Sequence, residues 1–155
     1  MTAPEIRAAK PEDRQNVLRC VNVAYAVYVG IVGRRPAPML ANYDALIEQG
    51  TVYVIDGARG IDGVLVIRPH DDHLLLENVA VRPSRQKQGL GRKLIAFAED
   101  QAMERGLSEV QLYTHVRMEG NLSVYPRLGY EETERRSEDG YERVYFRKQL
   151  QPLAD

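Results

Sequence analysis

Twelve residues in the middle of the chain carry the strongest sign of chemistry. Residues 82–93 read RPSRQKQGLGRK, which places five lysines and arginines together without an acid. Gly89 and Gly91 lack a Cβ, so the backbone there can approach a ligand closely. The segment leads into a stretch with helical periodicity, and a helix N-terminus offers free N–H groups and a dipole that favour an anion. These features predict a cradle for a pyrophosphate group.

The spacing of the glycines excludes two other phosphate-binding motifs. A dinucleotide fingerprint needs a third small residue three positions after Gly91, where the chain has Leu94. A P-loop needs the sequence Gly-Lys-Ser/Thr after four residues, which this segment lacks. The alternative that stays open is a solvated basic loop whose glycines serve as turn residues.

The elements around this segment follow from the hydrophobic periodicity. We expect a helix that begins near Pro11 and runs through Tyr28, a break over residues 30–38, and further helices over 39–49, 90–105 and 121–128. The expected strands are residues 5–9, 51–55, 61–68, 74–82, 109–114, 130–136 and 142–148. The last two strands form a hairpin across Glu138-Asp139-Gly140. This order predicts an α/β (α+β) domain in which helices pack on the faces of a mixed sheet.

The overall composition is that of a folded domain. The 155 residues predict one domain over 1–155, and 44% hydrophobic with 28% charged residues excludes a wholly disordered chain. The net charge of −1 argues against a nucleic-acid partner. Cys20 is the lone cysteine, so an internal disulfide is excluded. We find no apolar run of membrane-spanning length and no secretory signal, and expect a cytoplasmic protein without a membrane partner.

Two motifs resemble those of a known family. Residues 86–91, QKQGLG, resemble the Gln/Arg-x-x-Gly-x-Gly/Ala signature of the GNAT superfamily of N-acetyltransferases, and residues 78–83, NVAVRP, resemble the strand before it. Residues 121–130, NLSVYPRLGY, resemble the family's motif B. The element order is similar over nearly the whole chain. The resemblance implies a mixed, mostly antiparallel central sheet of about seven strands with helices on both faces.

The resemblance also implies roles in binding acetyl-CoA. Backbone groups of one strand would pair with its pantetheine arm, and loop amides with one arginine would hold its pyrophosphate. These residues are Val79, Ala80 and Val81 for the arm, and Gln86, Lys87, Gln88, Gly89, Leu90, Gly91 and Arg92 for the pyrophosphate. Asn121 would contact the cofactor arm, and Tyr125 would protonate the departing CoA thiolate.

Helical geometry agrees with the paired roles of Asn121 and Tyr125. Positions four apart share one helix face, so both side chains can reach one cleft. The alternative for Tyr125 is a core aromatic beside Leu128. Pro126 removes a helical hydrogen bond and is expected to kink or shorten this helix.

Transfer to an amine also requires removal of a proton from the nucleophile. Glu77 is the candidate base, because it interrupts an apolar strand and shares a face with Leu75 and Val79. The alternative is a carboxylate in a structural salt bridge. His115 is a second candidate base, with a solvated loop histidine as its alternative.

The resemblance implies that the region between the first two helices, together with the last hairpin, shapes the acceptor pocket. The candidate substrate-binding residues are Tyr25, Tyr28, Arg34 and Arg35. Paired arginines suit an acidic acceptor. The alternative is that both tyrosines belong to the core and both arginines are solvated. No metal site is expected, since the tight turn His70-Asp71-Asp72-His73 would not converge its side chains on an ion.

The function predicted is an acetyl-CoA-dependent N-acetyltransferase. It would move the acetyl group to a primary amine, that of a small molecule, by direct transfer in a ternary complex, because neither motif holds a cysteine. Cys20 is expected in the core. The alternatives are a non-catalytic acyl-CoA-binding or sensing domain, and an enzyme that acetylates a protein N-terminus or lysine. A homodimer is a further expectation from the resemblance.

Overall fold

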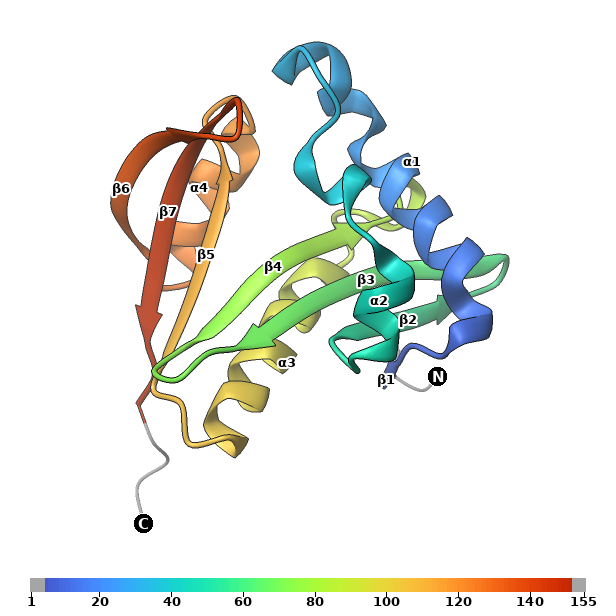
Figure 1. Ribbon diagram of the computed structural model, residues 1–155, viewed down its shortest axis with the longest axis horizontal. Coiled ribbons are helices and arrows are strands. Elements are labelled where there is room, and N and C mark those ends of the chain that lie inside the picture. Colours follow the sequence, from blue (N-terminus) through green and yellow to red (C-terminus); the bar gives the residue numbers. More distant parts are fainter. Residues whose placement is uncertain (1–4, 152–155) are drawn as a thin grey trace. The chain divides into compact units, whose positions relative to one another are not determined.

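The computed structural model describes residues 5–151, in which the strands and helices follow one another in the predicted order (Figure 1). The strands are β1 (Ile6–Ala8), β2 (Val52–Gly57), β3 (Gly60–Pro69), β4 (Leu74–Val81), β5 (Glu109–His115), β6 (Glu131–Glu138) and β7 (Tyr141–Gln149). The α-helices are α1 (Arg14–Val32), α2 (Tyr43–Glu48), α3 (Leu90–Glu104) and α4 (Glu119–Arg127). Short 3-10 turns are η1 (Pro11–Asp13), η2 (Ala37–Leu40) and η3 (Pro83–Arg85).

Hydrogen bonds join the strands in the order β1-β2-β3-β4-β5-β7-β6, as a seven-stranded sheet. The pairs β1–β2, β2–β3, β5–β7 and β6–β7 are antiparallel, and β4–β5 is parallel. This confirms the predicted mixed, mostly antiparallel sheet. The described residues form two compact units, an N-terminal unit (5–67 and 78–97) and a C-terminal unit (68–77 and 98–151). Organisation as a single domain stays a prediction.

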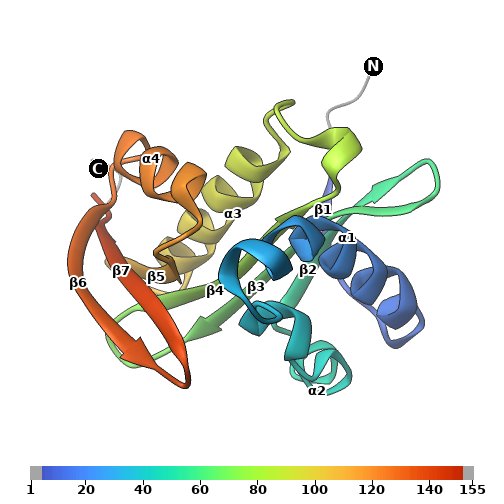
Figure 2. The ribbon, with the colours of Figure 1, turned by 90° about the horizontal axis from the view of Figure 1, so that it is seen from above.

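In the N-terminal unit, helices cover both faces of the strands. Every residue of β3 from 61 to 67 is buried, a pattern that requires cover on both sides. On one face, Val21 of α1 and Leu46 of α2 share a core cluster with β2, β3 and β4 (Figure 2). On the other face, the first half of α3 packs closely, with the rings of Tyr53 and Phe97 4.9 Å apart. Burial on both faces fixes the position of the strand ends that lead into the basic loop.

Helix α1 is longer than the sequence predicts. Gly30 lies inside the helix, and the chain leaves it at Gly33, which adopts the left-handed φ of 90°. The expectation that Gly30 begins the break is therefore wrong, because an interior glycine costs only about 1 kcal/mol and the helix bonds continue past it. By length and composition Pro11–Val32 could cross a membrane, contrary to the sequence expectation. One face of this helix, with Val17, Cys20 and Val21, is fully buried in the core.

The second predicted helix, 39–49, is interrupted in the structure. Residues 37–40 form the 3-10 turn η2, and α2 begins only at Tyr43. Asn42 causes the interruption, because its backbone is extended and its side chain accepts a hydrogen bond from the N–H of Ala45 at 3.2 Å. An asparagine that satisfies an otherwise free N–H group defines an N-cap, so it starts a new helix and does not continue the old one.

Replacing Asn42 by alanine is expected to destabilise the protein by about 1 kcal/mol through loss of this cap. A domain of this length should then melt roughly 2–4 °C lower. Thermal denaturation followed by circular dichroism measures the change. Asn22→Ala is the control, since Asn22 is exposed within α1 and alanine favours the helix. A loss at Asn22 equal to that at Asn42 would contradict the assigned cap.

In the C-terminal unit, β7 lies between β5 and β6, and residues 74–76 of β4 pair with β5. The hairpin turn is tighter than predicted, since Glu138 belongs to β6. Asp139 and Gly140 both have positive φ, 56° and 83°, as a two-residue turn requires. Strand β6 is exposed from 131 to 137, and its charged side chains suit an edge strand that must not pair with other chains.

Candidate functional site

Strand β4 presents two different faces. Asn78 and Ala80 are buried, whereas Glu77, Val79 and Val81 are half-buried. Asn78 is 4% exposed, and its amide accepts from the Tyr25 hydroxyl at 2.6 Å and donates to the Tyr43 hydroxyl at 3.1 Å. Both the oxygen and the nitrogen of this amide therefore have a partner, as a buried amide requires.

The same network reaches the segment that follows α1. The Tyr43 hydroxyl donates to the carbonyl of Pro38 at 2.6 Å. The Tyr25 hydroxyl also lies 3.2 Å from the carbonyl of Val79. Two tyrosines and one asparagine thus tie α1 and η2 to the strand that was predicted to pair with the pantetheine arm.

Four residues were predicted to bind the acceptor, and the structure places all of them in the N-terminal unit. Tyr25 takes part in the network with Asn78, and the ring of Tyr28 lies 6.3 Å from that of Tyr25. Arg34 and Arg35 are exposed and follow the glycine that ends α1. Tyr25 is therefore a residue that holds the strand, whereas Tyr28 lies beside it and the two arginines follow the helix.

The basic loop has the backbone of an anion cradle. Lys87 and Gly89 adopt positive φ of 65° and 85°, and α3 begins at Leu90. A Cβ on Gly89 would meet nothing within 4 Å. Among residues 5–151 no group accepts a hydrogen bond from the backbone N–H of residues 87–89. Positive φ at these positions turns successive N–H groups toward one side, which is the geometry of a backbone nest for anions.

Hydrogen bonds anchor both ends of the loop. Gln86 donates to the carbonyl of Val81 at 3.0 Å, and the N–H of Lys93 bonds the carbonyl of Gly89 at 3.0 Å. Arg92 is exposed in the first turn of α3. The residues predicted to hold a pyrophosphate are therefore adjacent to the end of β4 and the start of α3, as the sequence suggested.

Sequence reasoning missed Asp62. It is 6% exposed on β3, and its carboxylate lies 3.5 Å from the Nε of Arg82 and 3.3 Å from an Nη of Arg85. Arg82 also donates its backbone N–H to the carbonyl of Asp62 at 2.9 Å. A lone acid inside the apolar run 61–67 was the signal that could have found it.

The C-terminal unit holds the residues of the predicted motif B. The α4 helix begins at Glu119 and ends after Arg127, in place of 121–128. Asn121 donates to the Thr114 hydroxyl at 3.0 Å. Pro126 lies in the last turn of α4, where the lost hydrogen bond costs less than in the interior of a helix.

A Schellman motif at the end of α4 fixes Tyr125. The N–H of Tyr130 bonds the carbonyl of Tyr125 at 3.0 Å, and the N–H of Gly129 bonds that of Pro126 at 3.1 Å. Gly129 supplies the positive φ of 95° that the motif needs. The rings of Tyr125 and Tyr130 then meet edge to face at 5.8 Å, and Phe146 lies 5.7 Å from Tyr125. Burial raises the pKa of Tyr125 to about 12, so its hydroxyl keeps its proton at neutral pH.

Both candidate bases lie in the C-terminal unit. Glu77 forms an ion pair with Arg68, whose Nε lies 2.8 Å from Oε2, although the angle is not that of a hydrogen bond. The structure therefore contains the salt bridge that was the alternative to a base. His115 accepts from the N–H of Arg117 at 3.1 Å, and burial lowers its pKa, which favours a neutral ring. His115 is thus a neutral histidine with one nitrogen already engaged.

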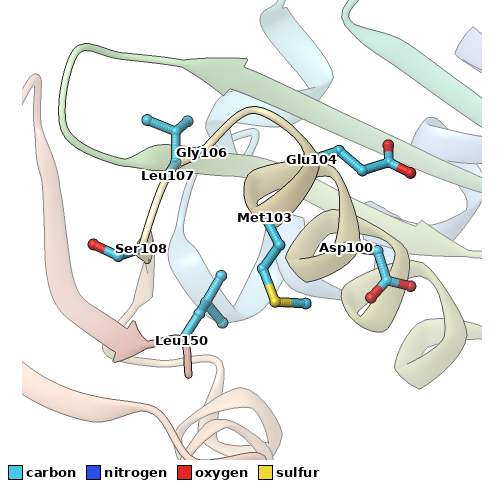
Figure 3. Close-up of a pocket in the computed structure, with 7 residues that line it drawn as sticks. All are labelled: Asp100, Met103, Glu104, Gly106, Leu107, Ser108 and Leu150. Atoms are coloured by element: carbon cyan, nitrogen blue, oxygen red, sulfur yellow. The ribbon is translucent and has the colours of Figure 1, made fainter. Parts of the chain in front are cut away.

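Three further features of the described residues concern the core, a cavity and metal binding. Cys20 is fully buried with its pKa raised to about 11 by burial, which confirms its place in the core. A cavity of about 590 Å³ in the C-terminal unit is lined by Asp100, Met103, Leu107 and neighbours, and none of the predicted site residues line it (Figure 3). Over residues 5–151 no cluster of three or more His, Cys, Asp or Glu side chains is placed to hold a metal ion.

Known proteins share both the sequence pattern and the fold. The [ribosomal protein bS18]-alanine N-acetyltransferase of Escherichia coli K12 is 34% identical over 61 residues, 39% of this chain and 41% of the relative. The uncharacterized N-acetyltransferase YvbK of Bacillus subtilis is 29% identical over 90 residues, 56% of this chain and 57% of the relative. This chain therefore matches less than two thirds of the length of these curated relatives.

Solved structures match over nearly the full length. The PaiA N-acetyltransferase of Thermoplasma acidophilum, solved with coenzyme A, superposes with a TM-score of 0.76 at 17% identity over 96% of this chain and all of that chain. The E. coli ribosomal-protein-S18-alanine N-acetyltransferase gives a TM-score of 0.76 at 19% identity, over 99% of this chain and 97% of that chain. The family model for the acetyltransferase (GNAT) family matches residues 25–130, which include the basic loop and α4. The chain belongs to the acetyltransferase (GNAT) family.

Proposed function

We propose that this protein transfers an acetyl group from acetyl-CoA to a primary amine. The observation that carries the proposal is the loop after β4, whose free backbone N–H groups and positive φ angles suit a pyrophosphate. Among known proteins, a structural neighbour of the same fold was solved with coenzyme A. The thioester of the cosubstrate supplies the acetyl group in one step, without an enzyme-bound intermediate.

The chain's own residues take the following parts in this proposal. Backbone N–H groups of residues 87–91 and the side chain of Arg92 bind the pyrophosphate. Backbone groups of residues 79–81 hold the pantetheine arm, and Asn121 contacts it through the amide oxygen that its bond to Thr114 leaves available. These contacts fix the thioester, so that binding energy is used to orient the reacting carbon.

Proton transfer completes the proposed reaction. Tyr125 keeps its proton at neutral pH and gives it to the sulfur as the C–S bond breaks. Glu77 takes a proton from the attacking amine, directly or through water, after its carboxylate exchanges the contact with Arg68. The net result is an amide and a free thiol, with one proton moved from nitrogen to the enzyme and one from the enzyme to sulfur.

Two classes of molecule are candidates for the acceptor, a small-molecule amine and a protein N-terminus. A small-molecule amine is favoured by the exposed arginines that follow α1, which suit an acceptor that carries a carboxylate. A protein N-terminus is favoured by the E. coli relative, whose name states that it is an alanine N-acetyltransferase of a ribosomal protein. Turnover with a panel of small amines and of peptides with free or blocked N-termini separates the two. Turnover with none would favour a non-catalytic acyl-CoA-binding domain.

Acetyl-CoA at ~100 times its dissociation constant is expected to stabilise the protein by ~2.7 kcal/mol. The melting temperature should then rise by several degrees in a domain of this size. Differential scanning fluorimetry with acetyl-CoA, and with NAD and ATP as controls, measures the shift. An equal shift with all three would show a general anion site, and no shift with acetyl-CoA would overturn the proposed function.

Location in the cytoplasm and assembly as a homodimer are further parts of this proposal. The lone buried Cys20 supports the first, because it needs no oxidising compartment. Size-exclusion chromatography with light scattering tests the second.

A further inference from the structure

Asp62 is an unusual residue to find behind an anion-binding loop. It is a buried carboxylate, and its charge opposes the binding of a pyrophosphate nearby. A Cβ added to Gly57 on the neighbouring strand would collide with this carboxylate, so the fold keeps a glycine to make room for it. Burial of a charge and a reserved space both indicate that Asp62 has a structural task in this loop.

The contacts of Asp62 define that task. One carboxylate oxygen lies 3.5 Å from Nε of Arg82, and the other lies 3.3 Å from Nη1 of Arg85. These arginines flank Pro83 and Ser84, so that the carboxylate spans both ends of η3. Arg82 is further tied to β3 by its backbone N–H to Asp62 and by Nη2 to the carbonyl of Ile61 at 3.3 Å.

The second arginine depends on the carboxylate more strongly than the first. The Nε of Arg85 is buried without an acceptor among residues 5–151, and its guanidinium forms an ion pair with Asp62. A guanidinium would not leave a buried donor unsatisfied unless another contact held it there. We infer that the ion pair with Asp62 holds the Arg85 guanidinium in place, although Arg85 is adjacent to the phosphate loop.

We propose that Asp62 is a positioning residue of the phosphate loop. Its carboxylate holds Arg82 and Arg85 at the two ends of η3. The backbone N–H groups of residues 87–91, and not these two arginines, then bind the pyrophosphate. The inference rests on the proposed function. Asp62 acts through the turn and touches no ligand. We call Asp62, Arg82 and Arg85 together the clamp. Arg92, in the first turn of α3, is not part of it.

The first test compares CoA, which carries the pyrophosphate, with pantetheine, which carries no phosphate. Asp62→Asn keeps the shape and removes the charge, and calorimetry measures the dissociation constants of CoA and of pantetheine. We expect CoA to bind about tenfold more weakly, the effect of one lost charged contact, and pantetheine to be unchanged. Asp56→Asn is the matched control, since that exposed carboxylate pairs with Arg7 on β1. Unchanged or tighter binding of CoA to Asp62→Asn would overturn the inference.

A double-mutant cycle separates a clamp from a direct contact. If Arg85 acts through Asp62, adding Arg85→Gln to Asp62→Asn should weaken CoA binding no further than either change alone. If Arg85 contacts the pyrophosphate by itself, the two losses add, which would overturn the proposed role. If Asp62→Asn fails to fold, Arg85→Gln, whose side chain is partly exposed, replaces it in the amide-exchange measurement that follows.

Amide exchange in the free protein keeps this inference distinct from the proposed function. The N–H of Arg85 bonds the carbonyl of Arg82 at 2.8 Å, and that of Gln86 bonds Pro83 at 3.3 Å. Asp62→Asn should speed exchange at these two amides in NMR, while Asp56→Asn should not. Unchanged exchange would overturn the clamp. Wild-type protein that shows no CoA binding would overturn the proposed function, and exchange would still decide whether Asp62 orders the turn.

Discussion

Replacing Tyr125 by phenylalanine is expected to lower kcat by ~10²–10⁴, the usual contribution of a general acid. The phenol holds a proton that a departing thiolate needs, and its pKa of about 12 keeps that proton in place through the working range of pH. The ring itself is held by the Schellman motif and by Tyr130 and Phe146. Phenylalanine keeps these ring contacts, so affinity for acetyl-CoA should stay within about twofold.

Steady-state kinetics and a separate measurement of acetyl-CoA affinity together test this expectation. Tyr130→Phe is the matched control, because it removes a buried hydroxyl in the same unit that bonds Glu99 at 2.9 Å. That change should cost about 1 kcal/mol of stability and leave kcat near that of the wild type. Equal kcat in wild type and Tyr125→Phe would exclude Tyr125 as the acid. Equal losses in both tyrosine variants would indicate a packing effect.

Replacing Gly89 by valine is expected to weaken CoA binding by roughly a hundredfold or more. A left-handed φ costs an L-residue about 1–2 kcal/mol, and a branched side chain raises that cost. Gly89 has φ of 85°, with open space where a Cβ would stand. Valine therefore disfavours this backbone conformation and shifts the loop amides that we propose bind the pyrophosphate. Isothermal titration calorimetry with CoA measures the loss.

Gly106 offers a control with the same backbone strain. It follows α3, has φ of 73°, and a Cβ added to it would also meet nothing within 4 Å. Gly106→Val should lower the melting temperature about as much as Gly89→Val, because both residues leave a left-handed conformation. CoA affinity should fall only in the Gly89 variant. Similar affinity losses in both would mean that global destabilisation, and not the loop, explains the result.

The network around Asn78 shows why the acceptor region was harder to predict. Tyr25 and Tyr28 lie on one helix, and their spacing puts both on the same helical face. In the structure Tyr25 is committed to Asn78 and Val79, which are distant in sequence. No local pattern encodes a hydrogen bond between residues more than 50 positions apart. Tertiary packing therefore decided that Tyr25 bonds to strand β4.

Local errors in the predicted elements have similar causes. The break inside 39–49 depended on one hydrogen bond, between Asn42 and Ala45. The helical conformation of Gly30 depended on the burial of α1 in the core. Propensity is a weak guide at such positions, since tertiary contacts override it. The hairpin at Asp139-Gly140 was located correctly and its length was not, because only the backbone shows that both residues take positive φ.

The sequence by itself determined the element order, the mixed sheet and the basic loop with its glycines, because periodicity and turn chemistry are local properties. The tertiary structure decided which charges are paired. Asp62 reaches two arginines of the loop, and Glu77 meets Arg68 on a neighbouring strand. These contacts join residues that only folding brings together, and burial then sets the strength of the interaction between their charges.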